Sequence, residues 1–193
     1  MNKKTVFAVI LTALLVLTLV FAYGFSKEKK VANNVKQECT SEIFWNLYYL
    51  SERLEFISHS GEYSEKDSEK IQYYLSGLEA NVGICSKLSG AKESLSGFST
   101  VARALGNYYS AQHNDVMVQS ILYDGKVSAD ELSFISALYA DLNLLLGEML
   151  LENGLGMRDN LSYGDIEEHL SEFLSKWGEW SWNSEAPYDL LNA

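Results

Sequence analysis

The sequence TVFAVILTALLVLTLVFAYGF, which runs from Thr5 to Phe25, contains no charged residue and no proline. Two lysines precede it, and the polar segment SKEKK follows it. About 20 consecutive apolar residues match the roughly 30 Å hydrocarbon core of a bilayer. We therefore expect a single transmembrane helix here, with the lipid bilayer as its partner.

The rest of the chain differs from this run in its charge. The 193 residues include 15 basic and 26 acidic residues, for a formal net charge of −11. Residues 1–30 hold five of the basic residues and one acidic residue, so 10 basic and 25 acidic residues give residues 31–193 a net charge of −15. Nucleic-acid binding requires a basic surface, and we expect no nucleic-acid partner. The predicted parts are a membrane segment at 1–30, a polar connector at 31–37 and an acidic helical domain at 38–193.

The apolar run is compatible with two interpretations, a cleaved secretion signal and an uncleaved membrane anchor. Lysines followed by an apolar run are also the layout of a secretion signal, and Ala22-Tyr23-Gly24 would permit cleavage after Gly24, releasing a secreted domain. The apolar region of a secretion signal has about 7–15 residues. The run from Thr5 to Phe25 is longer, so we favour an uncleaved single-pass anchor. Lysines flank both ends in near-equal numbers, but the short N-terminal tail favours the N-terminus inside and an extracytoplasmic domain.

Residues 38–193 are expected to be all-α. Ile43, Leu47, Leu50, Leu54 and Ile57 recur at spacings of three and four, which is typical of the buried face of a helix in a bundle. Residues 71–85 repeat this pattern, and further helices are expected within 91–123, 129–151 and 162–177. The expected fold is an N-terminal transmembrane helix followed by an antiparallel four-helix-bundle-like domain with a shorter fifth helix.

The chain has two cysteines, Cys39 and Cys85. They lie at equal distances from residue 62, beside a turn expected at Gly61, so a helical hairpin would bring them side by side. We predict a disulfide between them, which would place the domain outside the cytosol. The alternative is a pair of buried free thiols in a cytosolic domain.

The segment from Asp124 to Glu131 resembles the second half of a calcium-binding EF-hand loop. Leu122 stands where an early carboxylate ligand would be needed, so we interpret the segment as a turn before a helix capped by Ser128 and Glu131. No nucleophile-and-base motif or nucleotide-binding loop is present. We therefore expect no metal, no cofactor and no catalytic residue. The three histidines are His59, His113 and His169, and none has a second potential metal ligand at a suitable spacing.

Three of the four tryptophans, Trp177, Trp180 and Trp182, fall within six positions near the C-terminus. They either close the end of the core or form a binding surface for a membrane interface or a protein partner. We expect a non-enzymatic interaction or scaffold protein with a protein partner, and no pattern defines an oligomeric state. The alternative is a ligand-binding sensor bundle that acts through a membrane partner, with its ligand among core aromatics: Trp45, Tyr48, Tyr49, Tyr73, Tyr74, Tyr108 and Tyr109.

Overall fold

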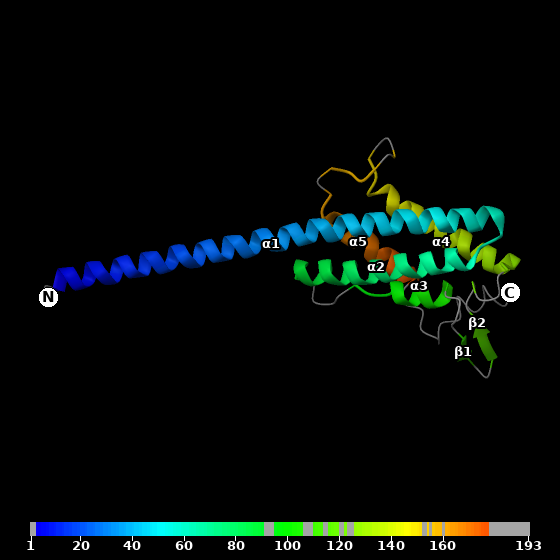
Figure 1. Cartoon of the computed structure of the whole chain (residues 1–193), viewed down its shortest axis with the longest axis horizontal. Coiled ribbons are helices and arrows are strands. Elements are labelled where there is room, and N and C mark those ends of the chain that lie inside the picture. Colours follow the sequence, from blue (N-terminus) through cyan, green and yellow to red (C-terminus); the bar gives the residue numbers. More distant parts are fainter. Residues whose placement is uncertain are drawn as a thin grey trace. The chain divides into compact units, whose positions relative to one another are not determined.

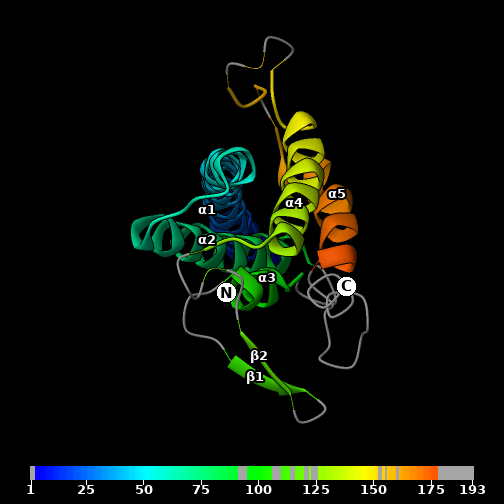
Figure 2. The same ribbon diagram turned by 90° about the vertical axis from the view of Figure 1, so that its right-hand side faces the viewer.

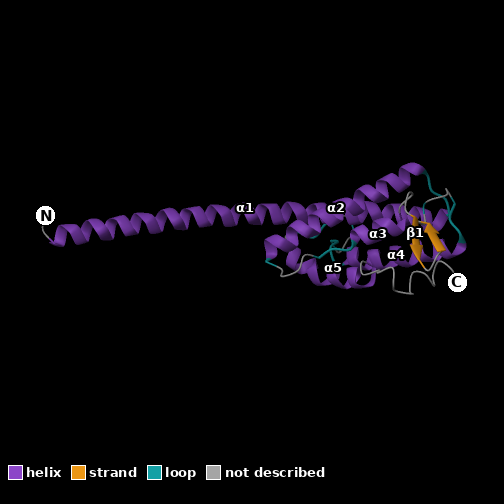
Figure 3. Cartoon of the chain, turned by 90° about the horizontal axis from the view of Figure 1, so that it is seen from below, coloured by secondary structure: helices purple, strands orange, loops and turns teal. Residues whose placement is uncertain are grey.

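The structure is a computed structural model of residues 1–193, and the residues that it describes form five helices and one β-hairpin, whose arrangement Figures 1 and 3 show. The helices bear out the all-α prediction. The chain divides into two compact units, Met1–Lys36 and Gln37–Ala193. The residues that the structure describes are 3–90, 95–105, 110–113, 116–119, 122, 126–151, 154, 156–159 and 161–177. In chain order the elements are α1 (Lys3–Ser60), α2 (Glu65–Ser89), α3 (Phe98–Leu105), β1 (Ser110–His113), β2 (Val116–Gln119), α4 (Ala129–Gly147) and α5 (Tyr163–Trp177).

The first unit is formed by the N-terminal part of α1. The helix continues through residues 31–37, which were predicted to be a connector, because this segment contains no proline or glycine to end it. The large apolar side chains between Leu14 and Phe25 are exposed. Within the described part of the chain, no helix is both long enough and apolar enough to cross a membrane. The predicted transmembrane helix from Thr5 to Phe25 is therefore not supported.

In the second unit, residues 37–60 of α1 form an antiparallel hairpin with α2. The turn between them contains Gly61, whose φ of 65° is left-handed, as the predicted turn requires. The side chain of Asn46 lies against Gly77, and the ring of Tyr49 stacks on that of Tyr74. Both predicted apolar faces are buried at this hairpin. These residues are Ile43, Leu47, Leu50, Leu54 and Ile57 on α1, and Ile71, Leu75, Leu78, Val82 and Cys85 on α2.

The longer helices of this unit are α2, α4, α5 and residues 37–60 of α1, and they contact one another in a ring around the core (Figure 2). The Ser51 hydroxyl donates to Asn143 at 2.8 Å and links α1 to α4. Phe134 of α4 packs edge-to-face on Trp177 of α5, with ring centroids 5.4 Å apart. The circuit closes through a buried hydrogen bond between the hydroxyls of Ser86 in α2 and Tyr163 in α5. α5 is therefore part of the core, and it is shorter than α4, as predicted.

The helix predicted within 91–123 is present but short. α3 occupies only Phe98–Leu105, and β1 and β2 follow it as an antiparallel pair. Gly97 has a φ of 136°, a backbone conformation outside the helical region, so the helix begins after it. α3 packs on α2, where the Gln72 amide donates to the Ala102 carbonyl at 2.8 Å. The described part of the segment between α2 and α4 thus contains one short helix and one β-hairpin.

α4 begins as predicted but ends earlier. The Ser128 N–H donates to the Glu131 carboxylate at 2.7 Å, and the Glu131 N–H donates to the Ser128 hydroxyl, which completes the predicted capping box. The helix ends at Gly147 instead of residue 151. The backbone beyond it turns, and Leu150 pairs with Met157 in an antiparallel bridge that replaces the last predicted helical turn.

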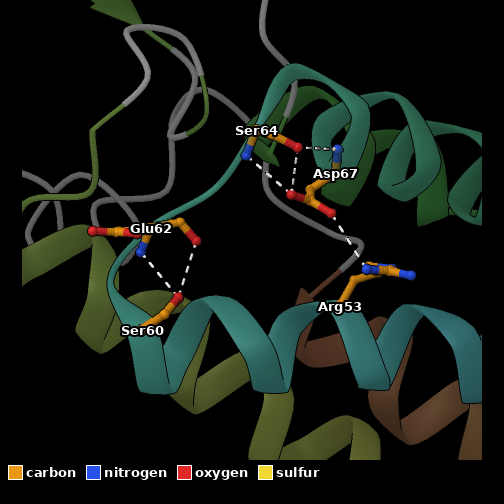
Figure 4. Close-up of polar contacts among 5 residues, drawn as sticks. All are labelled: Arg53, Ser60, Glu62, Ser64 and Asp67. Carbon is orange, nitrogen blue, oxygen red and sulfur yellow. Dashed lines mark hydrogen bonds and ion pairs between the residues drawn. The ribbon is translucent and has the colours of Figure 1, made fainter.

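The start of α2 is also fixed by a capping box, which Figure 4 shows. The Ser64 N–H and hydroxyl donate to Asp67 at 3.0 and 2.6 Å, and the Asp67 N–H donates back to the Ser64 hydroxyl. The Arg53 guanidinium on α1 reaches the other Asp67 oxygen at 3.4 Å. Burial acts to raise the pKa of Asp67, but the Ser64 hydrogen bonds and the charge of Arg53 outweigh it and hold this pKa below its ordinary value.

This lowered pKa predicts a pH-dependent effect of Asp67→Asn. A carboxyl with a lowered pKa in the folded state adds stability above its unfolded-state pKa and loses it as the pH falls through the folded-state pKa. We expect Asp67→Asn to reduce the free energy of unfolding by about 1 kcal/mol near pH 7. The difference from the wild type should shrink below pH 4. Denaturant titrations across this range measure it, and a difference that does not change with pH would contradict the assigned role of the carboxylate.

Candidate functional site

Five aromatic side chains gather on the outer surface of the α1–α2 hairpin. Trp45 and Tyr49 are each 42% exposed and Tyr73 is 72% exposed, so the prediction that they line the core is wrong. Tyr48 and Tyr74 are partly exposed beside them. We call these five residues the aromatic strip. The other two aromatics of that prediction, Tyr108 and Tyr109, lie outside the described residues.

The rings of the aromatic strip form one continuous row across the two helices. Trp45 stacks on Tyr49 with centroids 5.9 Å apart, and Tyr49 stacks on Tyr74 at 5.7 Å. Tyr73 meets Tyr74 edge-on at 5.7 Å, and Tyr48 meets both Trp45 and Tyr49 in the same way. Stacked and edge-to-face pairs each add about 0.5–1.5 kcal/mol beyond area burial. The strip is therefore a pre-arranged surface rather than a set of independently placed rings.

Carboxylates lie on the same face of α1 as the aromatic strip. Glu38, Glu42 and Glu52 are exposed, and with Trp45 and Tyr49 they follow the spacing of one helix face. The charge of Glu52, together with desolvation and a hydrogen bond between its carboxylate and the Tyr48 hydroxyl, raises the pKa of Tyr48. The surface thus combines neutral phenol rings with negative charge at neutral pH.

The two cysteines lie together, as their spacing predicted, but they are not bonded. Cys39 and Cys85 are both buried and the structure shows no disulfide between them, so the predicted bond is not supported. Burial raises the pKa of Cys39, a hydrogen bond with Cys85 opposes that rise, and Glu38 and Glu42 add to it. A protonated, buried thiol is a poor nucleophile and metal ligand. The pair therefore behaves as packing between α1 and α2.

The C-terminal tryptophans divide between the core and the undescribed tail. Trp177 is buried, packs on Phe134, and its indole N–H donates to Asp141 at 2.7 Å. This agrees with the core alternative for Trp177 and leaves no exposed ring there for a partner. Trp180 and Trp182 lie outside the described residues, so their predicted binding role stays a prediction.

Among the residues that the structure describes, no group of three or more His, Cys, Asp or Glu side chains is arranged to hold a metal ion. His59 is exposed and its Nδ1 lies 2.9 Å from the Glu55 carbonyl oxygen, and His169 lies 4.0 Å from Glu148. Glu131, the last ligand position of the EF-hand-like segment, is engaged in the capping box of α4. Asp124 at its start lies outside the described residues.

A cavity of about 720 Å³ lies along α5, away from the aromatic strip. It is open to solvent and borders several carboxylates. Among its lining residues, the Ser175 hydroxyl donates to the Glu172 backbone carbonyl at 2.8 Å, a contact within one turn of α5. Repulsion between neighbouring carboxylates disfavours an anionic ligand. They are Leu95, Gly164, Glu167, Glu168, Ser171, Glu172 and Ser175.

The aromatic strip was missed because its residues border the apolar face in sequence. Trp45 and Tyr49 adjoin Phe44 and Tyr48, and the four together look like a widened core face. A second periodicity identifies the exposed face: positions 38, 42, 45, 49, 52 and 56 are spaced by four and three, alternating with the buried set. Its acidic members indicate an exposed face.

Comparison of the whole chain with protein families, with curated proteins and with solved structures finds no match. The functional interpretation therefore rests on the chemistry of the described residues.

Proposed function

We propose that the chain is a single-pass, membrane-anchored protein whose extracytoplasmic helical domain is a non-enzymatic interaction or scaffold component. The observation that carries this proposal is the exposed aromatic strip. Burying large rings is worth more than leaving them in water, and exposed aromatic clusters are typical of protein interfaces. Five such rings in contact on one hairpin favour a protein partner over a purely structural role.

The membrane anchor is supported by the sequence from Thr5 to Phe25 and by the exposure of the large apolar side chains that follow Leu14. A bilayer would cover these side chains. The extracytoplasmic location rests on the signal-like layout of Lys3 and Lys4 before the apolar run, because the structure does not support the disulfide that would have added to it. Protein extracted from its own membrane and beginning at Phe25 would contradict the anchor, since it would show cleavage after Gly24.

The sensor alternative is weaker. It needs a ligand among core aromatics, and the described members of that set lie on the surface of the hairpin. The interaction proposal uses the same residues in their observed positions, so we retain it.

Site-specific crosslinking tests the interaction proposal. We expect a photoreactive p-benzoylphenylalanine at position 73 to give a discrete protein adduct in the native membrane. The matched control is position 144, because Tyr73 and Leu144 are each 72% exposed, on α2 and α4 respectively. Adducts from position 73 alone would support a partner at the strip. No adduct from either position, or equal adducts from both, would contradict it.

A further inference from the structure

The charge around the aromatic strip indicates the chemistry of its partner. On the outward face of α1, Glu38 and Glu42 lie two turns and one turn before Trp45, and Glu52 lies one turn after Tyr49. No basic residue occupies this face between positions 38 and 52. The side of the strip formed by α1 therefore offers rings bordered by carboxylates.

Three of the four basic residues of the hairpin, Lys66, Lys70 and Lys87, are on α2 and not on the α1 face that carries the carboxylates. Arg53 contacts Asp67 at the closed end of the hairpin. Lys66 and Lys70 are exposed on α2, where Lys70 lies one turn before Tyr73 and Tyr74, next to the acidic Glu69. The α2 side is mixed in charge, whereas the α1 side is negative. A bound cation would therefore be favoured over the rings nearest α1.

Aromatic faces and carboxylates attract the same kind of group. A cation over a Trp or Tyr ring gains about 0.5–1 kcal/mol at an exposed site. Arginine in particular stacks on aromatic rings and pairs with a carboxylate through two parallel hydrogen bonds. The net charge of −15 on residues 31–193 would also draw a basic segment toward the domain.

The other occupants fit less well. A second copy of this chain would bring the same three glutamates of each α1 face together, and like charges across an interface are repelled. An anionic lipid surface and a nucleic acid would be repelled for the same reason. A neutral sugar could stack on the rings and donate hydroxyls to the carboxylates, but it would leave their negative charge uncompensated.

Resting on the proposed interaction function, we infer that the aromatic strip together with Glu42 and Glu52 docks a basic segment of a protein partner. Arginine or lysine side chains of that segment lie over the rings and pair with the two carboxylates. The partner is recognised by cation–aromatic contacts and ion pairs, and its acidic or neutral counterpart is rejected.

The test uses the full chain in nanodiscs of uncharged lipid and two fluorescent probes, an oligo-arginine peptide and an oligo-glutamate peptide of equal length. We expect the arginine probe to bind and the glutamate probe not to bind. Glu42→Gln with Glu52→Gln should weaken arginine binding about three- to tenfold, and so should Tyr49→Leu with Tyr73→Leu. Fluorescence anisotropy measures the dissociation constants, and circular dichroism checks that each variant keeps its helices.

The matched control for charge is the double variant Glu168→Gln with Glu172→Gln on α5. It lowers the net negative charge by the same amount. We expect at most about a twofold effect from this pair. Equal weakening by both glutamate pairs, or unchanged binding in the tyrosine variant, would overturn the inference. A crosslinked adduct at position 73 without binding of the arginine peptide would contradict this inference but not the proposed interaction function. The absence of an adduct specific to the aromatic strip would contradict both.

Discussion

Phe134→Ala is expected to reduce the free energy of unfolding by about 3–5 kcal/mol, the range typical of removing a fully buried aromatic ring. Phe134 is fully buried and packs edge-to-face on Trp177, so it joins α4 to α5. Alanine would leave a cavity at this junction. The neighbouring backbone cannot collapse into it freely, because the Trp177 indole is held by Asp141.

The matched control is Leu144→Ala on the same helix. Leu144 is highly exposed, so its truncation should change stability by no more than about 0.5 kcal/mol. Denaturant unfolding of the full chain, followed by circular dichroism, gives both values. If Phe134→Ala does not fold, Phe134→Leu should still unfold at lower denaturant concentration than the wild type. Equal stability of the Phe134 and Leu144 variants would show that α5 is not packed on α4 in this way.

Gly77→Ala is expected to cost about 1–3 kcal/mol although it replaces glycine by a better helix former. A Cβ atom at this position would lie 2.9, 3.0 and 3.1 Å from the amide nitrogen, oxygen and carbon of Asn46. Asn46 is buried, and its amide donates to the Glu42 carbonyl at 2.8 Å. The added methyl group must therefore either displace this amide or separate α1 from α2.

Two further variants test that explanation. Gly147→Ala has no atom within 4 Å of its added Cβ, so it should be neutral or stabilise by up to about 1 kcal/mol. Asn46→Ala removes the obstacle, and the double variant with Gly77→Ala should lose less stability than the sum of the two single variants. Additive losses would mean that Asn46 is not what excludes a side chain at position 77.

Sequence periodicity predicted the helices whose buried faces are regular. The faces of α1 and α2 follow spacings of three and four without interruption, and both are buried as expected. The cap of α4 was predicted because Ser128 and Glu131 form a local motif whose geometry depends on no other part of the chain. The proximity of Cys39 and Cys85 followed from the position of one turn. Whether they are bonded did not, because that depends on oxidation and not on spacing.

The hydrophobic periodicity of the sequence did not predict two features, the bounds of α3 and the exposure of the aromatic strip. α3 begins at Phe98 because of the backbone conformation at Gly97 and because its first turn is anchored by Glu79, a residue of α2. Such a tertiary contact leaves no local pattern in residues 91–123. The aromatic strip was misassigned because ring side chains have similar sequence signatures in a core and at an interface. The difference lies in which neighbouring helix covers them.

The contact between Glu79 and the start of α3 has a consequence for the order of folding. The Gly97 and Ser99 N–H groups both donate to the Glu79 carboxylate, at 3.1 and 3.3 Å. An eight-residue helix is too short to persist alone in water, so α3 depends on a cap that exists only once α2 has formed. Hydrogen exchange at these two amides should therefore slow only after α2 is complete. The two amides would then report the step at which α3 packs onto α2.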